Sequence, residues 1–130
     1  MVLDEIGAFL AAGGIGTVGT TIFLGSSPDT PDACVTVYEY GGLPPEHTLG
    51  TDNVIERPRV QVVARGALND YAAARSKAKD IFNVMKGGLQ TLSGIRYLRI
   101  EPVDSPFVLR LDETTRWLVA CNYQIYKDAS

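Results

Sequence analysis

The first 56 residues of this sequence contain no basic residue. They carry eight acids and neither lysine nor arginine, whereas residues 57–130 carry seven acids and all twelve basic residues. The two parts therefore have formal charges of 0 − 8 = −8 and 12 − 7 = +5, which sum to the net charge of −3. Because the acidic part is rich in apolar residues, we expect it to fold and not to form an acidic tail.

Residue types that carry chemistry are also scarce. The chain has one histidine, His47, and two cysteines, Cys34 and Cys121. A single histidine argues against a zinc or iron site, and any Ser/His/Asp or Cys/His catalytic set would depend on that residue. The cysteines lie far apart in apolar segments, which favours buried free thiols over a disulfide. We therefore expect a protein that is not an enzyme and that binds no metal or cofactor.

Long apolar runs are missing as well. The longest uncharged stretch, residues 6–28, is interrupted by six glycines, whereas a membrane-spanning helix needs about 20 mostly apolar residues. Asp4 and Glu5 stand where a signal peptide carries positive charge. We therefore expect a cytoplasmic protein with no membrane partner. Its 130 residues, 45% of them hydrophobic, are enough for a single domain over 1–130.

Apolar spacing predicts two helices. Residues 2–12 have apolar positions at i, i+3 and i+7 and end at two glycines, which is typical of a short helix. Residues 69–86 form a longer one, about 27 Å at 1.5 Å per residue, with Asn69 as its N-cap. The apolar stripe of this long helix consists of Tyr71, Ala74, Ala78, Ile81, Phe82 and Met85.

Alternating side chains predict the strands. They include 20–25, 33–40, a strand that starts at Pro58, two strands around Ser93-Gly94, and a hairpin that turns at residues 112–115. One face of each strand should enter the core. The expected core residues are Val60, Val62 and Ala64, followed by Trp117, Val119, Cys121, Tyr123 and Ile125. The fold class is then α+β, a mainly antiparallel β-sheet packed by one long central helix and a short N-terminal helix.

Two segments are predicted to be loops. Residues 26–32 are rich in turn formers, and residues 41–56 have no periodicity and contain two adjacent prolines. A loop as long as the second is usually functional or disordered. The acidic pairs Asp29 with Asp32 and Asp112 with Glu113 are too sparse for a dedicated calcium site and are typical of turns.

Gly14-Ile-Gly16-Thr-Val-Gly19 matches the GxGxxG pattern of dinucleotide-binding proteins. That motif needs a strand before it and a helix after it, so that the pyrophosphate lies at the helix N-terminus. Here a helix precedes it and a strand follows. The order indicates a flexible helix-to-strand connection.

Four segments, in this order and spacing, resemble a known family. They are IGTVGTTIFLGSSPDTPDACVTVYEYGG, RPRVQVVARGALNDYAAARSKAKDIF, GIRYLRIEPVDSPFVLRLDE and RWLVACNYQIYK. Together they resemble the phage minor capsid or tail terminator family of long-tailed bacteriophages over roughly residues 14–127. The family offers no short catalytic motif, so no active site is carried over.

The resemblance implies a subunit of a homo-oligomeric ring, expected to be six-fold, at the head-proximal end of the tail. Such a ring would stop polymerisation of the major tail tube protein and dock a head-completion or connector protein. It would be assembled in the host cytoplasm and remain in the virion. Opposite charges on the two parts of the chain suit head-to-tail contacts, although the charges could also intersperse on one subunit.

The resemblance also gives candidate residues. Arg57, Arg59 and Arg65 become candidates for the subunit interface. The candidate lumen or docking residues lie in the two loops and are Asp29, Asp32, Glu46 and Asp52. Six copies would carry 6 × −3 = −18, so that DNA would pass through without binding. Two alternatives stay open: another head-tail connector such as a stopper or adaptor, or a small cytoplasmic ligand-binding domain.

Overall fold

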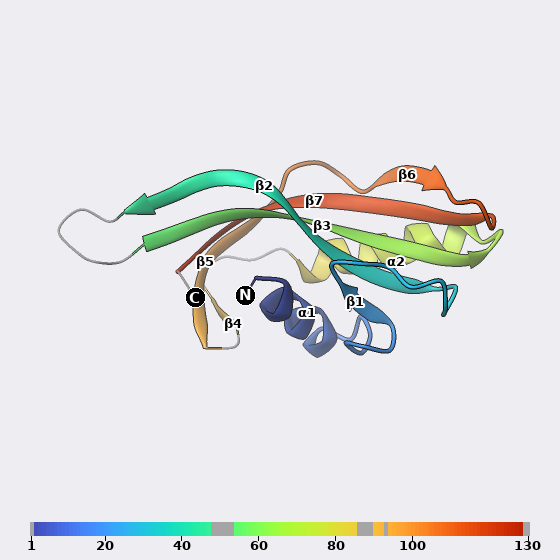
Figure 1. The fold of residues 1–130 in the computed structure, drawn as a ribbon, viewed down its shortest axis with the longest axis horizontal. Coiled ribbons are helices and arrows are strands. Elements are labelled where there is room, and N and C mark those ends of the chain that lie inside the picture. The colour runs from blue at the N-terminus through green and yellow to red at the C-terminus, as the bar shows by residue number, and fades with distance from the viewer. Residues whose placement is uncertain (1, 48–53, 86–89, 93, 129–130) are drawn as a thin grey trace.

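A computed structural model describes residues 2–47, 54–85, 90–92 and 94–128. Most of these residues lie in a β-sheet, and two helices pack against it (Figure 1). In chain order the elements are α1 (Val2–Ala12), β1 (Ile22–Leu24), β2 (Cys34–His47), β3 (Val54–Leu68), α2 (Tyr71–Val84), β4 (Gln90–Leu92), β5 (Ile95–Pro102), β6 (Phe107–Leu111) and β7 (Arg116–Asp128). In outline this is the α+β composition that the sequence predicts.

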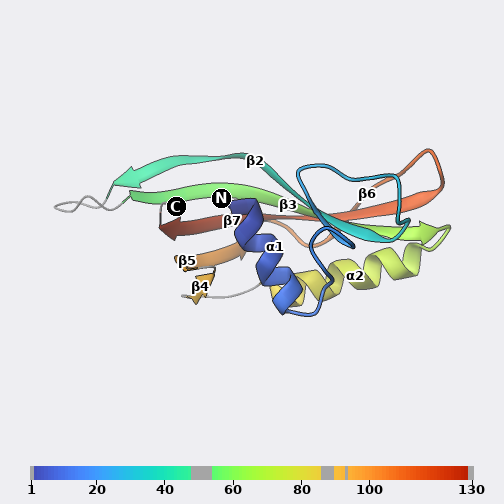
Figure 2. The ribbon, with the colours of Figure 1, turned by 60° about the horizontal axis from the view of Figure 1, so that its bottom comes forward.

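The sheet is mixed, with the strand order β1-β2-β3-β7-β5-β4 and with β6 pairing to β7. Among the described strands every pairing is antiparallel, as the prediction of a mainly antiparallel sheet implies, except that of β1 with β2, which is parallel. The loop over residues 25–33 is long enough to return the chain to the start of β2, which a tight hairpin turn cannot do. The sheet also curls around α1: this helix contacts β1 and β2 near one edge of the sheet and β4 at the other edge (Figure 2).

The longer helix is shorter than predicted. α2 has 14 residues and packs on one face of the sheet against β3 and β7, the two middle strands of the sheet order. Its N-cap is Asp70, whose carboxylate accepts the Ala73 N–H at 3.0 Å. Asn69, the predicted cap, precedes it with φ of 57°. The predicted end at Lys86 lies outside the described residues.

The prediction of a long loop over residues 41–56 is wrong for the part that the structure describes. Residues 41–47 belong to β2 and residues 54–56 to β3, and the two strands form a long antiparallel hairpin. Glu46 pairs with Ile55 in this ladder. The two prolines fall at an irregularity between Leu43 and Glu46, where a bulge tolerates residues that cannot donate a ladder hydrogen bond. Asp52 lies outside the described residues.

The predicted core faces are confirmed. Both helices and one face of the sheet enter a single apolar cluster, and the second face has only a small cluster of its own. The members of the main cluster that alternation predicted are Val60, Val62, Ala64, Val119, Cys121, Tyr123 and Ile125, with Trp117 at its margin. The hairpin turn at residues 112–115 and the strands β4 and β5 are also where the sequence places them. Among the described helices none is long and apolar enough to cross a membrane.

Candidate assembly surfaces

The outer face of the sheet, opposite α1 and α2, carries an ordered row of polar side chains. Tyr40 on β2 pairs with Arg59 on β3, Arg59 pairs with Gln124 on β7, and Gln124 pairs with Glu101 on β5. The row therefore crosses four strands. No helix residue enters the small apolar cluster on this side. Tyr40 is exposed, Arg59 and Glu101 are partly exposed, and Gln124 is buried between them.

Gln124 organises the centre of that row. Pro58 has no N–H and so interrupts the ladder between β3 and β7. The Gln124 side-chain amide donates to the carbonyl oxygens of Arg57 at 3.0 Å and Pro58 at 3.2 Å. Its Oε1 accepts from Nε of Arg59 at 2.7 Å. One buried side chain thus repairs the ladder and fixes the Arg59 guanidinium.

Further arginines and tyrosines flank the row. Arg57 donates from Nε and Nη2 to the carbonyl oxygen of Pro44, at 2.9 and 2.7 Å. The Arg99 guanidinium lies 4.3 Å from the ring centroid of Tyr126, in cation–π contact. Tyrosine and arginine are enriched at protein interfaces and among the residues that dominate their binding energy. This arginine–tyrosine face, defined by Tyr40, Arg57, Arg59, Arg99 and Tyr126, is the surface best suited to a protein partner.

Arg65 shares the strand face of Arg59 but is not available to a partner. The residue is only 7% exposed. Its guanidinium donates to backbone carbonyl oxygens of the loop over residues 25–33, at 2.8 Å to Asp32 and 2.7 Å to both Pro28 and Pro31. The assignment of Arg65 as a subunit-interface residue is therefore corrected: it anchors a loop of its own subunit.

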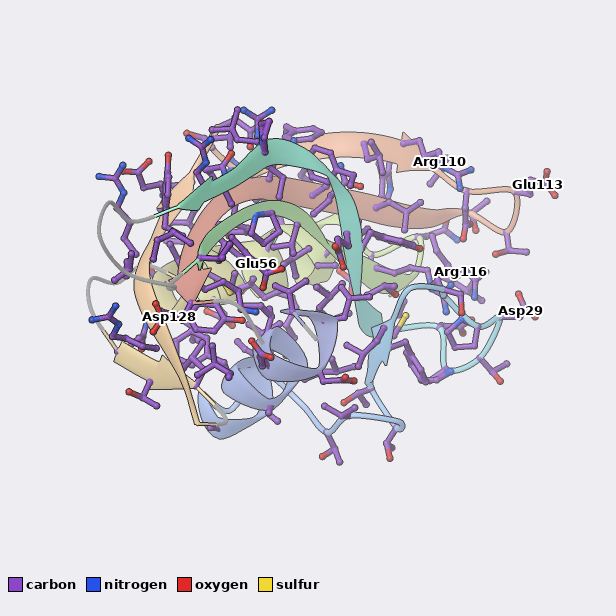
Figure 3. The ribbon with its side chains drawn as sticks, turned by 60° about the vertical axis from the view of Figure 1, so that its left-hand side comes forward. Asp29, Glu56, Arg110, Glu113, Arg116 and Asp128 are labelled. Atoms are coloured by element: carbon purple, nitrogen blue, oxygen red, sulfur yellow. The ribbon has the colours of Figure 1, made fainter. Side chains whose placement is uncertain are left out.

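Arg116 holds the same loop from β7 (Figure 3). Its guanidinium pairs with Asp112 at 2.8 Å and with Asp29 and Asp32 at 3.2 Å each. The side chain of Arg116 is 7% exposed and that of Asp29 is 86% exposed, so the pairs join a buried cation to a surface loop. Burial raises the pKa of Asp112, but hydrogen bonds from Arg116 and Thr114 outweigh it and lower the value to about 2.

The candidate docking residues Asp29 and Asp32 are thus brought together by one arginine. Their loop is unpaired by any strand, as the sequence predicts, yet Arg65 and Arg116 turn its carbonyl groups inward. A loop fixed in this way loses little conformational entropy when a partner binds it. Glu46 lies on the β2–β3 hairpin at the other end of the sheet, far along β2 from this loop.

A second buried charge cluster joins α1 to the last strand. Lys127 is 1% exposed, and its Nζ lies 3.2 Å from Glu5 and 3.3 Å from Glu56. The Tyr97 hydroxyl donates to Glu5 at 2.6 Å. Burial raises the pKa of Glu5, but the hydrogen bonds from Tyr97 and Lys127 outweigh it, so that the pKa is lowered overall. The cluster fixes α1 against β3, β5 and β7, and Glu56, whose side chain is 41% exposed, forms its outer margin.

The sequence motifs that carry chemistry elsewhere do not converge here. The glycine-rich connection follows α1 and precedes β1, in the order predicted for a simple connection. Cys34 and Cys121 are buried free thiols, as predicted, and burial raises the pKa of Cys121 to about 11. Among the described residues no three His, Cys, Asp or Glu side chains cluster as metal ligands.

Three residues that organise these surfaces escaped the sequence reasoning. They all lie on β7: Arg116 and Gln124 alternate with its core residues, and Lys127 lies on the core face itself. Nothing in the sequence next to them distinguishes them from other strand residues. The only available signal for Gln124 was Pro58, which predicts a ladder gap but does not say which side chain fills it.

Comparison with known proteins identifies the family of this chain. Residues 9–128 match the family model described as bacteriophage tail terminator protein. No curated protein matches the sequence. A solved chain from the "Virion of native gene transfer agent (GTA) particle" is similar in structure, with a TM-score of 0.56 and 15% identity over 92% of this chain and 84% of that one. That likeness shows a shared fold. Since the family match covers nearly the whole sequence and confirms the resemblance of the four segments, this chain belongs to the bacteriophage tail terminator protein family, a family of structural tail proteins.

Proposed function

We propose that this chain is a tail terminator subunit that closes into a ring, with six copies, on the head-proximal end of the tail tube. There the ring stops polymerisation of the major tail tube protein and presents a docking surface to a head-completion or connector protein. The observation that carries this proposal is the family match over residues 9–128. The structure supports it with a sheet face that neither helix covers and with arginines that are held in fixed positions by neighbouring groups.

The arginine–tyrosine face is one part of the proposed subunit boundary. Arg57 and Arg59 are held in place by Pro44 and Gln124, so their guanidinium groups are already oriented when a partner arrives. A neighbouring subunit offers the acidic residues 1–56. Opposite charge on different parts of one chain favours heterologous contacts, which close into a ring when the rotation allows it.

The loop over residues 25–33 is the proposed docking element. Asp29 and Asp32 lie on it, and we assign the same role to Glu46 of β2 and to Asp52, which lies outside the described residues. Six subunits with a net charge of −3 each give the ring a net charge of 6 × −3 = −18. A channel lined by these acidic loops would repel phosphate and let DNA pass without specific binding.

The first experiment is to disrupt the gene in its parent phage and to measure tail lengths in the lysate by electron microscopy. Overlong, headless tails of variable length are the expected result, because nothing would stop the tube. Tails of normal length that fail to join heads would instead identify a stopper or adaptor. Normal infectious particles would overturn a role in assembly.

The contribution of the arginines is tested by complementation. Arg57→Glu combined with Arg59→Glu is expected to abolish the shortening of tails in the disrupted phage, while the purified variant remains folded. Lys77→Glu is a matched control, because Lys77 lies on α2 and its Nζ bonds the Ile15 carbonyl on the other side of the sheet. Full activity of the double variant would remove Arg57 and Arg59 from the interface.

A further inference from the structure

The two edge strands β1 and β6 are joined by one lateral row of paired residues that crosses the sheet. Strand pairing joins Ile22 to Val35, Val35 to Ala64, Ala64 to Val119, and Val119 to Val108. One lateral row of side chains thus begins on β1, crosses β2, β3 and β7, and ends on β6. Side chains in one row of a sheet point to the same face, which here is the face that α1 and α2 cover.

The row is buried until it reaches β6. Ile22, Val35, Ala64 and Val119 are at most 2% exposed, whereas Val108 is 42% exposed. Leu109, at 42%, and Leu111, at 45%, are also open to solvent, on either side of the exposed Arg110. Among the described strands β6 pairs only with β7, so its other side is a free edge there. An apolar free edge is an association site unless something covers it.

The opposite edge carries a smaller apolar surface. Val18, in the turn before β1, is 43% exposed and bridges to Ile22. It lies beside α1: a Cβ placed on Gly7 would be 3.5 Å from Val18 and 2.9 Å from Leu24. This edge is thus built from the β1 turn and α1 together.

Strand directions allow the two edges to meet. β1 is parallel to β2, and three antiparallel pairings then lead from β2 through β3 and β7 to β6. β6 therefore runs antiparallel to β1. A second copy set beside the first with the same strand direction brings its β1 edge against the β6 edge of the first, at the same level. Such a contact joins two different patches and is the kind that closes a ring.

The helices beside the two edges have opposite charges. α2 presents Arg75 and Lys79 in a groove, beside the segment that leads into β6, where Arg75 donates to the carbonyl oxygen of Pro106 at 2.7 Å. α1 carries the exposed Asp4 and the buried Glu5 and no basic residue. Apolar contact between the strands and attraction between the helices would therefore act together.

We propose that the β6–α2 edge of one subunit, formed by Val108, Leu109, Leu111, Arg75 and Lys79, packs against the β1–α1 edge of a second copy, formed by Val18 and Asp4. The proposal rests on the ring-forming function above. It extends the subunit boundary from the outer-face arginines to the two sheet edges.

Cross-linking between two single variants tests this contact. Val18→Cys and Leu109→Cys are prepared separately in the full-length chain, mixed with tail tubes, and treated with a short bismaleimide. A covalent dimer is expected from the mixture and from neither variant alone. The two native cysteines are buried, so the unchanged protein shows the background. Thr91→Cys, at an exposed position on β4, replaces Leu109→Cys as a control and should give no dimer.

The outcomes separate the surface from the function. Loss of ring closure and of tail shortening in Leu109→Arg, with both retained in Thr91→Arg, supports the proposed edge contact. A Leu109→Cys dimer without its partner variant indicates a two-fold contact and overturns it. Rings that form normally in Leu109→Arg and yield no mixed cross-link also overturn it, yet leave the proposed function intact. An unchanged protein that neither closes rings on tubes nor shortens tails overturns the proposed function itself.

Discussion

Arg59 and Arg65 lie on the same face of the same strand and have opposite roles. Arg59 is half-buried and is held by one neighbouring side chain, Gln124. Arg65 is 7% exposed and bonds the carbonyl oxygens of an entire loop. The difference comes from what each guanidinium contacts: Arg65 bonds the loop over residues 25–33, whereas the hydrogen bond of Arg59 goes to a side chain of the neighbouring strand.

The comparison separates orientation from availability. Strand alternation correctly places both guanidinium groups on the outer face of the sheet. Whether a side chain meets a partner or its own subunit depends on loops that are distant in sequence, here residues 25–33 for Arg65. A protein that assembles needs both kinds of arginine, one to fix the shape of its docking loop and one to meet the neighbour.

Replacing each arginine with methionine tests this contrast most strongly. Arg65→Met should lower the free energy of unfolding by roughly 2–4 kcal/mol, because it leaves several loop carbonyl groups without a donor. Arg59→Met should cost less than about 1 kcal/mol, since it removes one bond at a half-buried site. Urea unfolding of the two variants gives both values. Equal costs would show that the loop is not held by Arg65.

Acid should release the same loop while the outer face stays unchanged. The pKa of Asp112 falls from 3.8 to about 2 on folding. A lowered pKa means that the carboxylate stabilises the fold fully above the unfolded value near 4, and that this stabilisation is lost as the pH falls through 2. Limited pepsin digestion between pH 4 and 2 should show cleavage within residues 25–33 appearing only at the acid end. The Asp112→Asn variant should be cleaved within residues 25–33 at pH 4 as well as at pH 2. Protection of this variant at pH 4 would show that the Asp112 carboxylate does not hold the loop.

The sequence predicted the core faces, both helices and the loop at residues 26–32, because alternation and 3.6-residue spacing are local signals. It missed the β2–β3 hairpin, because Gly41, Gly42 and two prolines read as breakers. In the structure a bulge and the side chain of Arg57, bonded to the Pro44 carbonyl, accommodate them. The site residues divide in the same way: Arg57 and Arg59 follow from alternation, whereas Arg116 and Gln124 depend on contacts more than 60 residues away in sequence.

Gln124 sharpens the comparison on the exposed side. Gln124→Leu should destabilise the fold by about 1–2 kcal/mol, because two carbonyl groups beside Pro58 lose their donor. It should also free the Arg59 guanidinium and weaken assembly without changing its charge. Thermal unfolding measures the first effect and ring yield on tail tubes the second. Gln61→Leu is the control and should leave ring yield unchanged, because Gln61 lies one row along the sheet and its side chain donates to Asn122 and not to a ladder carbonyl group beside Pro58.

The smallest effect on the stability of the fold is expected from salt. Salt should weaken the contacts of the exposed arginines and leave those of the buried arginines unchanged. At 1 M salt the Debye length falls to about 3 Å, so attraction between exposed charges is largely lost, while buried groups are screened much less. The melting temperature of the isolated chain should therefore change little, because Arg65 and Arg116 are buried. In the unchanged protein, ring closure that uses Arg57 and Arg59 should weaken between 0.1 and 1 M salt. In the Arg57→Glu and Arg59→Glu double variant, any closure that remains should depend less on salt, because the apolar β6 edge would drive it. Ring closure that is unaffected by salt in the unchanged protein would place the subunit boundary at the apolar edges alone and leave the outer-face arginines for another partner.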